Sequence, residues 1–242
     1  MEVQTIRDTK FIKEALSVAR LALDSDNPIA EIVGGTGSGK STAARRMVEV
    51  MKAVRIACWD GISRHQLLKK AAEALGIEGA GAVDRLLMEG MDPDAPRRLL
   101  IVDEANKLNW RALEALRYLA DECRVAVVLV GTEFYERQFT GARTRELLLQ
   151  LGRRIGAKRA RMGHLDRAET YGHILKPICG DCADKEIVTK FWHGCRKGNW
   201  GDGMELAQEC KRLMAVHELP TLNTAVLDAA LAWTANRHAV EV

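Results

Sequence analysis

The sequence lacks a long hydrophobic run, and its N-terminus lacks an apolar segment. The longest run, residues 125–130, has the length of a strand, whereas a membrane-spanning helix needs about 20 consecutive apolar residues. Glu2, Arg7 and Asp8 are charged where a secretory signal would be apolar. We therefore expect neither a membrane span nor a signal peptide, and a cytoplasmic location.

Cysteines are few, and their spacing is unlike that of a disulfide-rich secreted domain. Cys179 and Cys182 have the separation found in half of a tetrahedral zinc site, but His193 and Cys195 are too close together for the usual second half. We favour reduced thiols, and a zinc site stays open as the alternative. The six positions are Cys58, Cys123, Cys179, Cys182, Cys195 and Cys210.

The sequence also has no strong excess of either charge. A net charge of +3, with 47% hydrophobic and 29% charged residues, is ordinary for a globular protein, and it does not by itself indicate a nucleic-acid partner. The basic residues are nevertheless concentrated, because residues 143–161 contain a single acid, Glu146. The basic members of that segment are Arg143, Arg145, Arg153, Arg154, Lys158, Arg159 and Arg161.

Short apolar runs alternate with helical patterns over the first two thirds of the chain. Strands are predicted at residues 29–33, 54–58, 99–102 and 125–130, and helices at residues 12–23, 42–51, 63–75, 83–89 and 109–122. Ser63 and Gln66 have the spacing of a capping box at the start of one helix. Continuous apolar strands that alternate with helices indicate an α/β fold, with a parallel sheet covered on both faces.

The pattern changes after Met162. Asp166 and Glu169 begin a helix, and further helices are predicted at residues 185–192, 204–216 and 223–238. We therefore expect an α/β core over residues 1–162 and an all-helical C-terminal subdomain over residues 163–242.

A phosphate-binding loop follows the first predicted strand. The pattern G-x-x-x-x-G-K-[ST] is satisfied in full by Gly34, Gly35, Thr36, Gly37, Ser38, Gly39, Lys40 and Ser41. The glycines let backbone N–H groups face the phosphates, and the helix that follows from Thr42 adds partial positive charge. We expect Lys40 to reach the β and γ phosphates of ATP, and the hydroxyl of Ser41 to bind Mg²⁺.

A second motif supplies an acidic pair. The apolar run at residues 99–102 ends in Asp103 and Glu104, which we interpret as the magnesium-binding carboxylate and the general base that orients the attacking water. A helix-capping pair is the alternative for this pattern taken alone. The guanine-reading sequence Asn-Lys-x-Asp is absent, since residues 106–109 read Asn-Lys-Leu-Asn.

Two further positions suit ATP hydrolysis. Thr132 follows the strand at residues 125–130 and is placed to sense the γ phosphate, although an ordinary strand-end threonine fits as well. Arg153 and Arg154 lie where an oligomeric ATPase presents an arginine to its neighbour's ATP, with a surface arginine pair as the alternative.

The order of these motifs resembles an AAA+ ATPase, that is, a P-loop NTPase with a three-layer sandwich and a C-terminal helical lid. Within that group the chain is similar to the Mu B-like transposition ATPases of transposable phages, and more distantly to the IstB-like and TnsC-like ATPases. The likeness runs from about residue 2 to residue 216. It is carried by residues 100–108, 113–117, 127–132, 140–144 and 154–159.

The resemblance implies a slow ATPase, stimulated by DNA or a partner, that forms a homo-oligomeric filament or ring on duplex DNA. It also implies a transposase as partner. The family grips DNA phosphates with the loop after the second strand and nearby helices, which here points first to Arg64 and then to Lys69 and Lys70. Such contacts are largely independent of sequence.

The sequence departs from the family in three ways. The family carries an N-terminal helix-turn-helix domain, whereas this chain begins where the ATPase is expected. Thr132 often corresponds to an asparagine, and residues 198–204 have no arginine where a second sensor usually lies. Two other functions stay open: an IstB-like helicase loader, and a secretion or signalling AAA+ ATPase without DNA contact.

Overall fold

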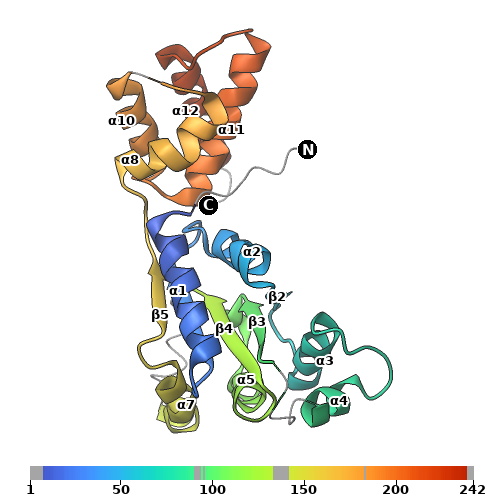
Figure 1. The fold of residues 1–242 in the computed structure, drawn as a ribbon. Coiled ribbons are helices and arrows are strands. Elements are labelled where there is room, and N and C mark those ends of the chain that lie inside the picture. Colours follow the sequence, from blue (N-terminus) through green and yellow to red (C-terminus); the bar gives the residue numbers. More distant parts are fainter. Residues whose placement is uncertain (1–7, 90–93, 95, 133–141, 183, 239–242) are drawn as a thin grey trace. The chain divides into compact units, whose positions relative to one another are not determined.

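The computed structural model describes residues 8–89, 94, 96–132, 142–182 and 184–238 (Figure 1). Residues 140 and 141, which belong to one of the stretches that carry the family resemblance, lie outside them. The chain divides into two compact units. The larger comprises Lys10–Gly35 and Lys40–Met162, and the smaller comprises Met1–Thr9, Thr36–Gly39 and Gly163–Val242. No helix among the described residues is long and apolar enough to cross a membrane.

The described part of the larger unit contains a five-stranded parallel sheet in the order β2-β3-β4-β1-β5. The predicted parallel sheet is confirmed, and the four predicted strands match to within one residue at each end. Because β1, β3 and β4 are central neighbours and all run in one direction, their carboxyl ends meet at one edge. The strands are β1 (Ile29–Gly34), β2 (Val54–Ala57), β3 (Arg98–Asp103), β4 (Val125–Gly131) and β5 (Arg159–Met162).

The strand β5 was not predicted, because its residues read as part of a basic run. The exposed residues Arg159 and Arg161 alternate with the buried residues Ala160 and Met162, as expected for an edge strand with one solvated face. Arg159 pairs with Glu31 of β1 at 3.0 Å, and this carboxylate is only 1% exposed. The basic segment therefore contributes to the sheet as well as to the surface.

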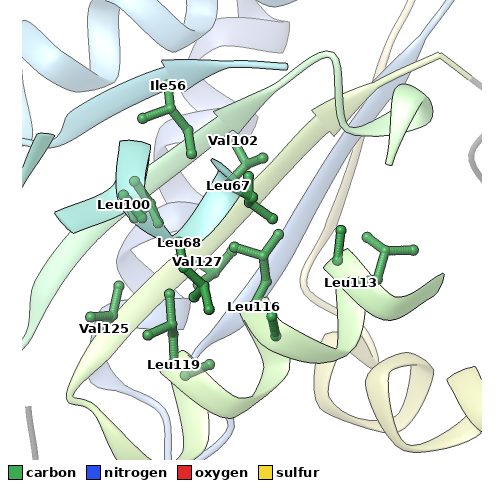
Figure 2. Packing of buried hydrophobic residues seen from close by; sticks show 14 of the residues in the cluster. Ile56, Leu67, Leu68, Leu100, Val102, Leu113, Leu116, Leu119, Val125 and Val127 are labelled. Carbon is green, nitrogen blue, oxygen red and sulfur yellow. The ribbon is translucent and has the colours of Figure 1, made fainter. Parts of the chain in front are cut away.

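Helices cover both faces of the sheet, which confirms the three-layer fold class. One apolar cluster joins alternate residues of β2, β3 and β4 to α3 and α5 (Figure 2). The cluster extends to Leu151 and Ile155 of α7. The other face is contacted by α1 and α2. The helices of this unit are α1 (Lys10–Asp24), α2 (Lys40–Met51), α3 (Arg64–Ala74), α4 (Ala82–Glu89), the 3₁₀ turn η1 (Ala105–Lys107), α5 (Trp110–Glu122) and α7 (Ala142–Ile155).

Local capping begins several helices as the sequence indicates. The predicted capping box at Ser63 and Gln66 is present at α3, and Asn109 caps α5 by accepting from the backbone N–H of Ala112. Such a cap contributes about 1 kcal/mol. These bonds fix where α3 and α5 start, which positions the charged residues of their first turns.

The described residues of the smaller unit form helices and no strand. Leu175, Phe191, Leu206 and Leu227 are all at most 2% exposed and form part of its core. The predicted helix start at Asp166 is confirmed by a capping box with Glu169. The helices are α8 (Arg167–Thr170), the π-helical turn η3 (Tyr171–Leu175), α9 (Lys176–Cys179), α10 (Lys185–Gly194), α11 (Trp200–Val216) and α12 (Thr224–His238).

Candidate nucleotide-binding site

The P-loop turns between the end of β1 and the first residue of α2. Gly37 and Gly39 have φ angles of 74° and 91°, in the left-handed region where glycine avoids the steric cost of a side chain. The helix α2 begins at Lys40, so its N-terminal N–H groups and partial positive charge lie at the turn. This strand, turn and helix suit a phosphate group.

The side chain of Lys40 is folded back onto the loop. Its Nζ donates to the carbonyl oxygens of Gly34 and Gly35 at 2.9 and 2.8 Å. Burial lowers the pKa of Lys40, and the carboxylates of Glu104 and Asp103 oppose that change. The ammonium group is therefore held at the base of the phosphate-binding turn, within electrostatic reach of the acidic pair.

The acidic pair lies at the carboxyl end of β3. Asp103 is only 2% exposed, and its Oδ1 accepts the backbone N–H of Glu104 at 3.0 Å. Glu104 has a left-handed backbone with φ 59° and ψ 37°, which is uncommon for a residue other than glycine and recurs at functional sites. Its side chain is 42% exposed, and its carboxylate pairs with Lys107 at 3.5 Å. One acid is thus buried and the other faces solvent.

Arg55, which the sequence analysis did not single out, binds the buried acid. Its Nε and Nη2 lie 3.1 and 2.5 Å from Oδ2 of Asp103. In the parallel register Ala57 is opposite Asp103, so Arg55, two residues earlier, points to the same face of the sheet. A charged residue inside an otherwise apolar strand was the available signal, but its partner depends on the order of the strands.

The donor set fits Mg²⁺ and a phosphate group. Ser38 Oγ and Thr132 Oγ1 are buried hydroxyl oxygens with no hydrogen-bond partner in the described part of the chain, and such groups are costly unless a ligand satisfies them. The hydroxyl of Ser41 and the carboxylate of Asp103 are hard oxygen ligands of the kind that Mg²⁺ prefers. Ser41 belongs to the first turn of α2, one residue after Lys40.

Thr132 lies directly after β4, at the same edge of the sheet. Its backbone N–H donates to Oδ1 of Asn106 at 3.1 Å. A Cβ atom at Gly131 would come within 3.0 Å of the same oxygen, so glycine permits this close approach. Asn106 therefore ties the loop after the acidic pair to the end of β4. The contact between Asn106 and Thr132 was not predicted, although Asn106 belongs to the stretch at residues 100–108 that carries the family resemblance.

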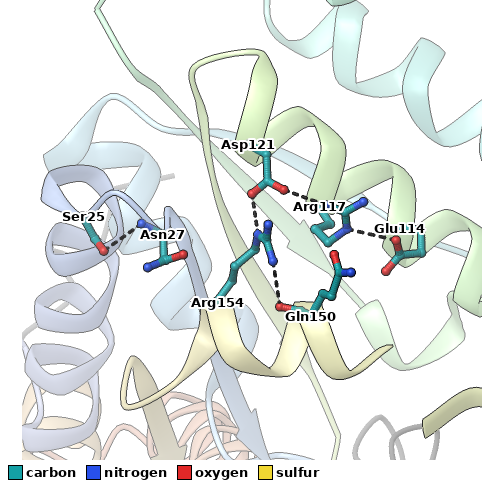
Figure 3. A network of polar contacts seen from close by, with 7 residues as sticks. All are labelled: Ser25, Asn27, Glu114, Arg117, Asp121, Gln150 and Arg154. Atoms are coloured by element: carbon teal, nitrogen blue, oxygen red, sulfur yellow. Dashed lines mark hydrogen bonds and ion pairs between the residues drawn. The ribbon is translucent and has the colours of Figure 1, made fainter. Parts of the chain in front are cut away.

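Arg154 lies in an ion-pair network within its own subunit (Figure 3). Its Nε is 2.5 Å from Oδ1 of Asp121, and its Nη1 donates to the carbonyl oxygen of Gln150 at 3.1 Å. The other oxygen of Asp121 accepts from Arg117 at 2.6 Å, and Arg117 also bonds Glu114 at 2.9 Å. Asp121 and Arg117 were not among the predicted site residues. The neighbouring Arg153 is exposed.

The three DNA-binding candidates lie on α3 in different settings. Arg64 is exposed at the first residue of the helix. Lys69 is exposed and lies 3.9 Å from Glu73, a surface pair that contributes little. Lys70 is turned back, since its Nζ donates to the carbonyl oxygen of Ala57 at 3.3 Å and lies over the ring of Trp59 at 4.6 Å.

In the smaller unit, the turn Thr36–Gly39 packs against the start of α11. Asn199 is 2% exposed, and its Nδ2 donates to the carbonyl oxygen of Thr36 at 3.0 Å. The backbone N–H of Gly201 donates to the carbonyl oxygen of Gly37 at 2.8 Å. The contact of Asn199 was not predicted, although this segment drew attention because it lacks a second-sensor arginine.

The cysteine cluster of the smaller unit does not assemble a metal site among the described residues, where no three His, Cys, Asp or Glu side chains are arranged to hold an ion. Cys179 and Cys195 are buried and donate to backbone carbonyl oxygens, each at 3.3 Å. Burial raises the pKa of Cys195, which favours the protonated thiol.

Comparisons with known proteins give the fold and a sequence likeness. Residues 23–139 match the family described as an AAA domain. The Aeropyrum pernix ORC2 protein has a TM-score of 0.64 at 14% identity, covering 91% of this chain and 66% of that one. At that identity the likeness shows the fold alone.

The chain is also similar in sequence to two B proteins of Mu-like phages. The Mu-like prophage FluMu DNA transposition protein B of Haemophilus influenzae is 31% identical over 131 residues, which cover 52% of this chain and 44% of that protein. The ATP-dependent target DNA activator B of Escherichia phage Mu is 28% identical over 171 residues, which cover 67% of this chain and 53% of that protein. The match thus spans about half the length of these relatives. Residues 23–139 thus match the AAA domain family, and the chain is similar in sequence to the DNA transposition protein B of a Mu-like prophage and to the target DNA activator B of phage Mu.

Proposed function

We propose that this chain is an ATP-dependent DNA-binding regulator of transposition, which assembles as a homo-oligomer on duplex DNA, delivers target DNA and activates a transposase. The observation that carries the proposal is the joint presence of the P-loop and acidic pair at one edge of the sheet and a sequence likeness to a protein named as an ATP-dependent target DNA activator. We also propose that residues 1–162 act as the ATPase core and residues 163–242 as its lid.

The chemistry assigned to the core is the hydrolysis of ATP to ADP and phosphate. Lys40 leaves its carbonyl partners to bind the β and γ phosphates, and Ser38 uses its buried hydroxyl to bind phosphate oxygen. Ser41 and Asp103 would hold Mg²⁺, which would supply neutralising charge to the phosphates. The exposed carboxylate of Glu104 orients and deprotonates the attacking water, and Thr132 meets the γ phosphate.

The assembly supplies the remaining charge. Arg154, assisted by Arg153, stabilises the transition state on a neighbouring subunit. Residues 198–204, around the start of α11, contain no arginine. The positive charge that a second-sensor arginine would supply is therefore missing from this segment. We therefore expect slow hydrolysis that depends on assembly.

Electron microscopy with duplex DNA tests the proposal. Filaments or rings should form on DNA with a non-hydrolysable ATP analogue and be absent with ADP. A DNA-bound assembly that also stimulates strand transfer by a transposase supports the full proposal. Failure to bind DNA in every nucleotide state would favour a secretion or signalling ATPase, and stimulation of helicase loading instead would favour a helicase loader.

A further inference from the structure

A cavity of about 310 Å³ lies between the start of α3 and the outer face of α5. Its lining combines arginines from both helices with aromatic rings. The residues that matter here are Arg64, Trp110, Arg111, Glu114, Arg117 and Tyr118. The cavity belongs to the larger unit and shares no residue with the P-loop or the acidic pair.

The cavity carries uncompensated positive charge. The charge of Arg117 is already compensated, since Arg117 forms ion pairs with both Glu114 and Asp121. Within the described part of the chain Arg64 forms no ion pair, and Arg111 lies over the ring of Trp110 at 4.6 Å without a carboxylate partner. The one carboxylate of the lining, Glu114, is paired with Arg117, and two further guanidinium groups without a carboxylate partner favour an anionic ligand.

The helix ends strengthen this preference. Arg64 is the first residue of α3, and Trp110 is the first residue of α5. The N-terminal turn of a helix carries partial positive charge and favours anions. Planar guanidinium groups bind phosphate through paired hydrogen bonds, and they do so better than lysine.

We propose that this cavity binds a backbone phosphate of duplex DNA, so that the DNA contact passes from α3 to Arg111 on α5. This inference rests on the proposed function and adds residues to its DNA site. A polyanion suits the position because Arg64, the first of the proposed DNA contacts, lines the cavity. Arg64 also directly follows the loop after β2. Trp110 and Tyr118, which is 38% exposed, offer apolar edges to the sugars that separate successive phosphates.

The test compares Arg111→Ala with Arg20→Ala, which removes an exposed arginine from α1. Fluorescence anisotropy with labelled duplex DNA and a non-hydrolysable ATP analogue gives Kd over a range of salt concentrations. Arg111→Ala should weaken binding about tenfold and flatten the plot of log K against log salt by about 0.9 for each phosphate that is no longer neutralised. Arg111→Lys should keep most of the slope with intermediate affinity, and Arg20→Ala should match the wild type.

Thermal melting and nucleotide binding, measured in parallel, report whether each variant is folded. Equal DNA binding by Arg111→Ala and Arg20→Ala would overturn the cavity assignment and leave the proposed function standing. Loss of transposase stimulation with DNA binding intact would assign the cavity to an acidic protein segment instead. Inorganic phosphate should displace DNA no better than its ionic strength predicts, and specific displacement would mean that the site takes a free anion. A wild-type protein that never binds DNA would remove the proposed function, and this inference with it.

Discussion

Arg55 forms an ion pair with Asp103, the carboxylate that is proposed to bind Mg²⁺. The Asp103 side chain is 3% exposed, and a carboxylate in that position is costly without a partner. Arg55, one-third exposed, compensates this charge when no metal ion is bound. In the proposed site, Mg²⁺ would therefore compete with the guanidinium group for the carboxylate of Asp103.

Arg55→Ala should increase the affinity of the ATP-bound protein for Mg²⁺ several-fold, because the metal ion no longer displaces a cation. It should also lower the metal-free stability by about 1–2 kcal/mol, a figure reduced for the exposure of Arg55. The release of a fluorescent ATP analogue, followed over a range of Mg²⁺ concentrations, measures the affinity for Mg²⁺. Urea unfolding measures the metal-free stability. Arg55→Lys, which keeps the charge, is the control. An unchanged Mg²⁺ half-saturation would show that Arg55 has a structural role only.

Substitutions of Lys40 and Glu104 should have separate effects on ATP binding and on ATP hydrolysis. Lys40→Ala should abolish ATP binding, since it removes the ammonium at the phosphate-binding turn. Glu104→Gln should keep ATP binding and reduce turnover about 10²–10⁴-fold, the range expected when a general base is lost. Equilibrium binding and phosphate release distinguish them. Wild-type turnover in Glu104→Gln would show that the base has been wrongly assigned.

The helix α5 joins two of the proposed sites along one face. Its buried face packs on the sheet through Leu113, Leu116 and Leu119. Its outer face carries Arg111 and Arg117, and ends at Asp121, which holds Arg154. Side chains three and four residues apart on a helix are neighbours. One row of charged residues on α5 therefore links the cavity to Arg154, the arginine proposed to act on the ATP of a neighbouring subunit.

Arg154→Ala should fold and bind ATP, because Asp121 keeps Arg117 as a partner at 2.6 Å. We expect it to lose ATP-dependent assembly or DNA-stimulated hydrolysis. Arg153→Ala, which removes the adjacent exposed arginine, should do less. Mixtures of Arg154→Ala with Lys40→Ala subunits should regain part of the activity, since each supplies what the other lacks. No recovery in the mixture, or equal loss in both single variants, would count against a trans role for Arg154.

The sequence predicted the features that depend on contiguous residues and missed those that depend on contacts between distant ones. The strands β1, β3 and β4 are continuous apolar runs, and the P-loop is a contiguous motif, so both were predictable. The edge strand β5 was missed because its two arginines were read as part of the basic segment at residues 143–161. The pairing of Arg55 with Asp103 joins residues 48 positions apart, and it exists only because β2 and β3 are neighbours in that register. The same holds for Asp121 with Arg154, 33 positions apart.

At the scale of the whole molecule, the proposed DNA contact is local. The net charge of +3 cannot hold a polyanion by itself, so binding must depend on clustered cations and on many subunits acting together. ATP should therefore control DNA binding through assembly. In the proposed assembly, each subunit would add only a few phosphate contacts.

ATP, but not ADP, should make this protein bind duplex DNA as a multimer with little sequence preference. Affinity should fall steeply with salt, with log K decreasing by about 0.9 per phosphate neutralised for each unit of log salt. Arg64→Ala should lower affinity for all sequences alike and flatten that slope. Lys69→Ala with Lys70→Ala should do less, because Lys70 is bonded back to Ala57 and Lys69 lies near Glu73.

Anisotropy titrations on several unrelated duplexes, with sedimentation to measure assembly, check this ordering. ATP binding without DNA should persist in Arg64→Ala, since α3 carries no residue assigned to the nucleotide. A salt-independent affinity, or variants that change the preferred sequence, would mean that the contacts are made to base edges elsewhere. A larger loss in the double lysine variant than in Arg64→Ala would mean that Lys70 leaves the Trp59 ring when DNA binds, and that the middle of α3, not its first turn, meets the phosphates.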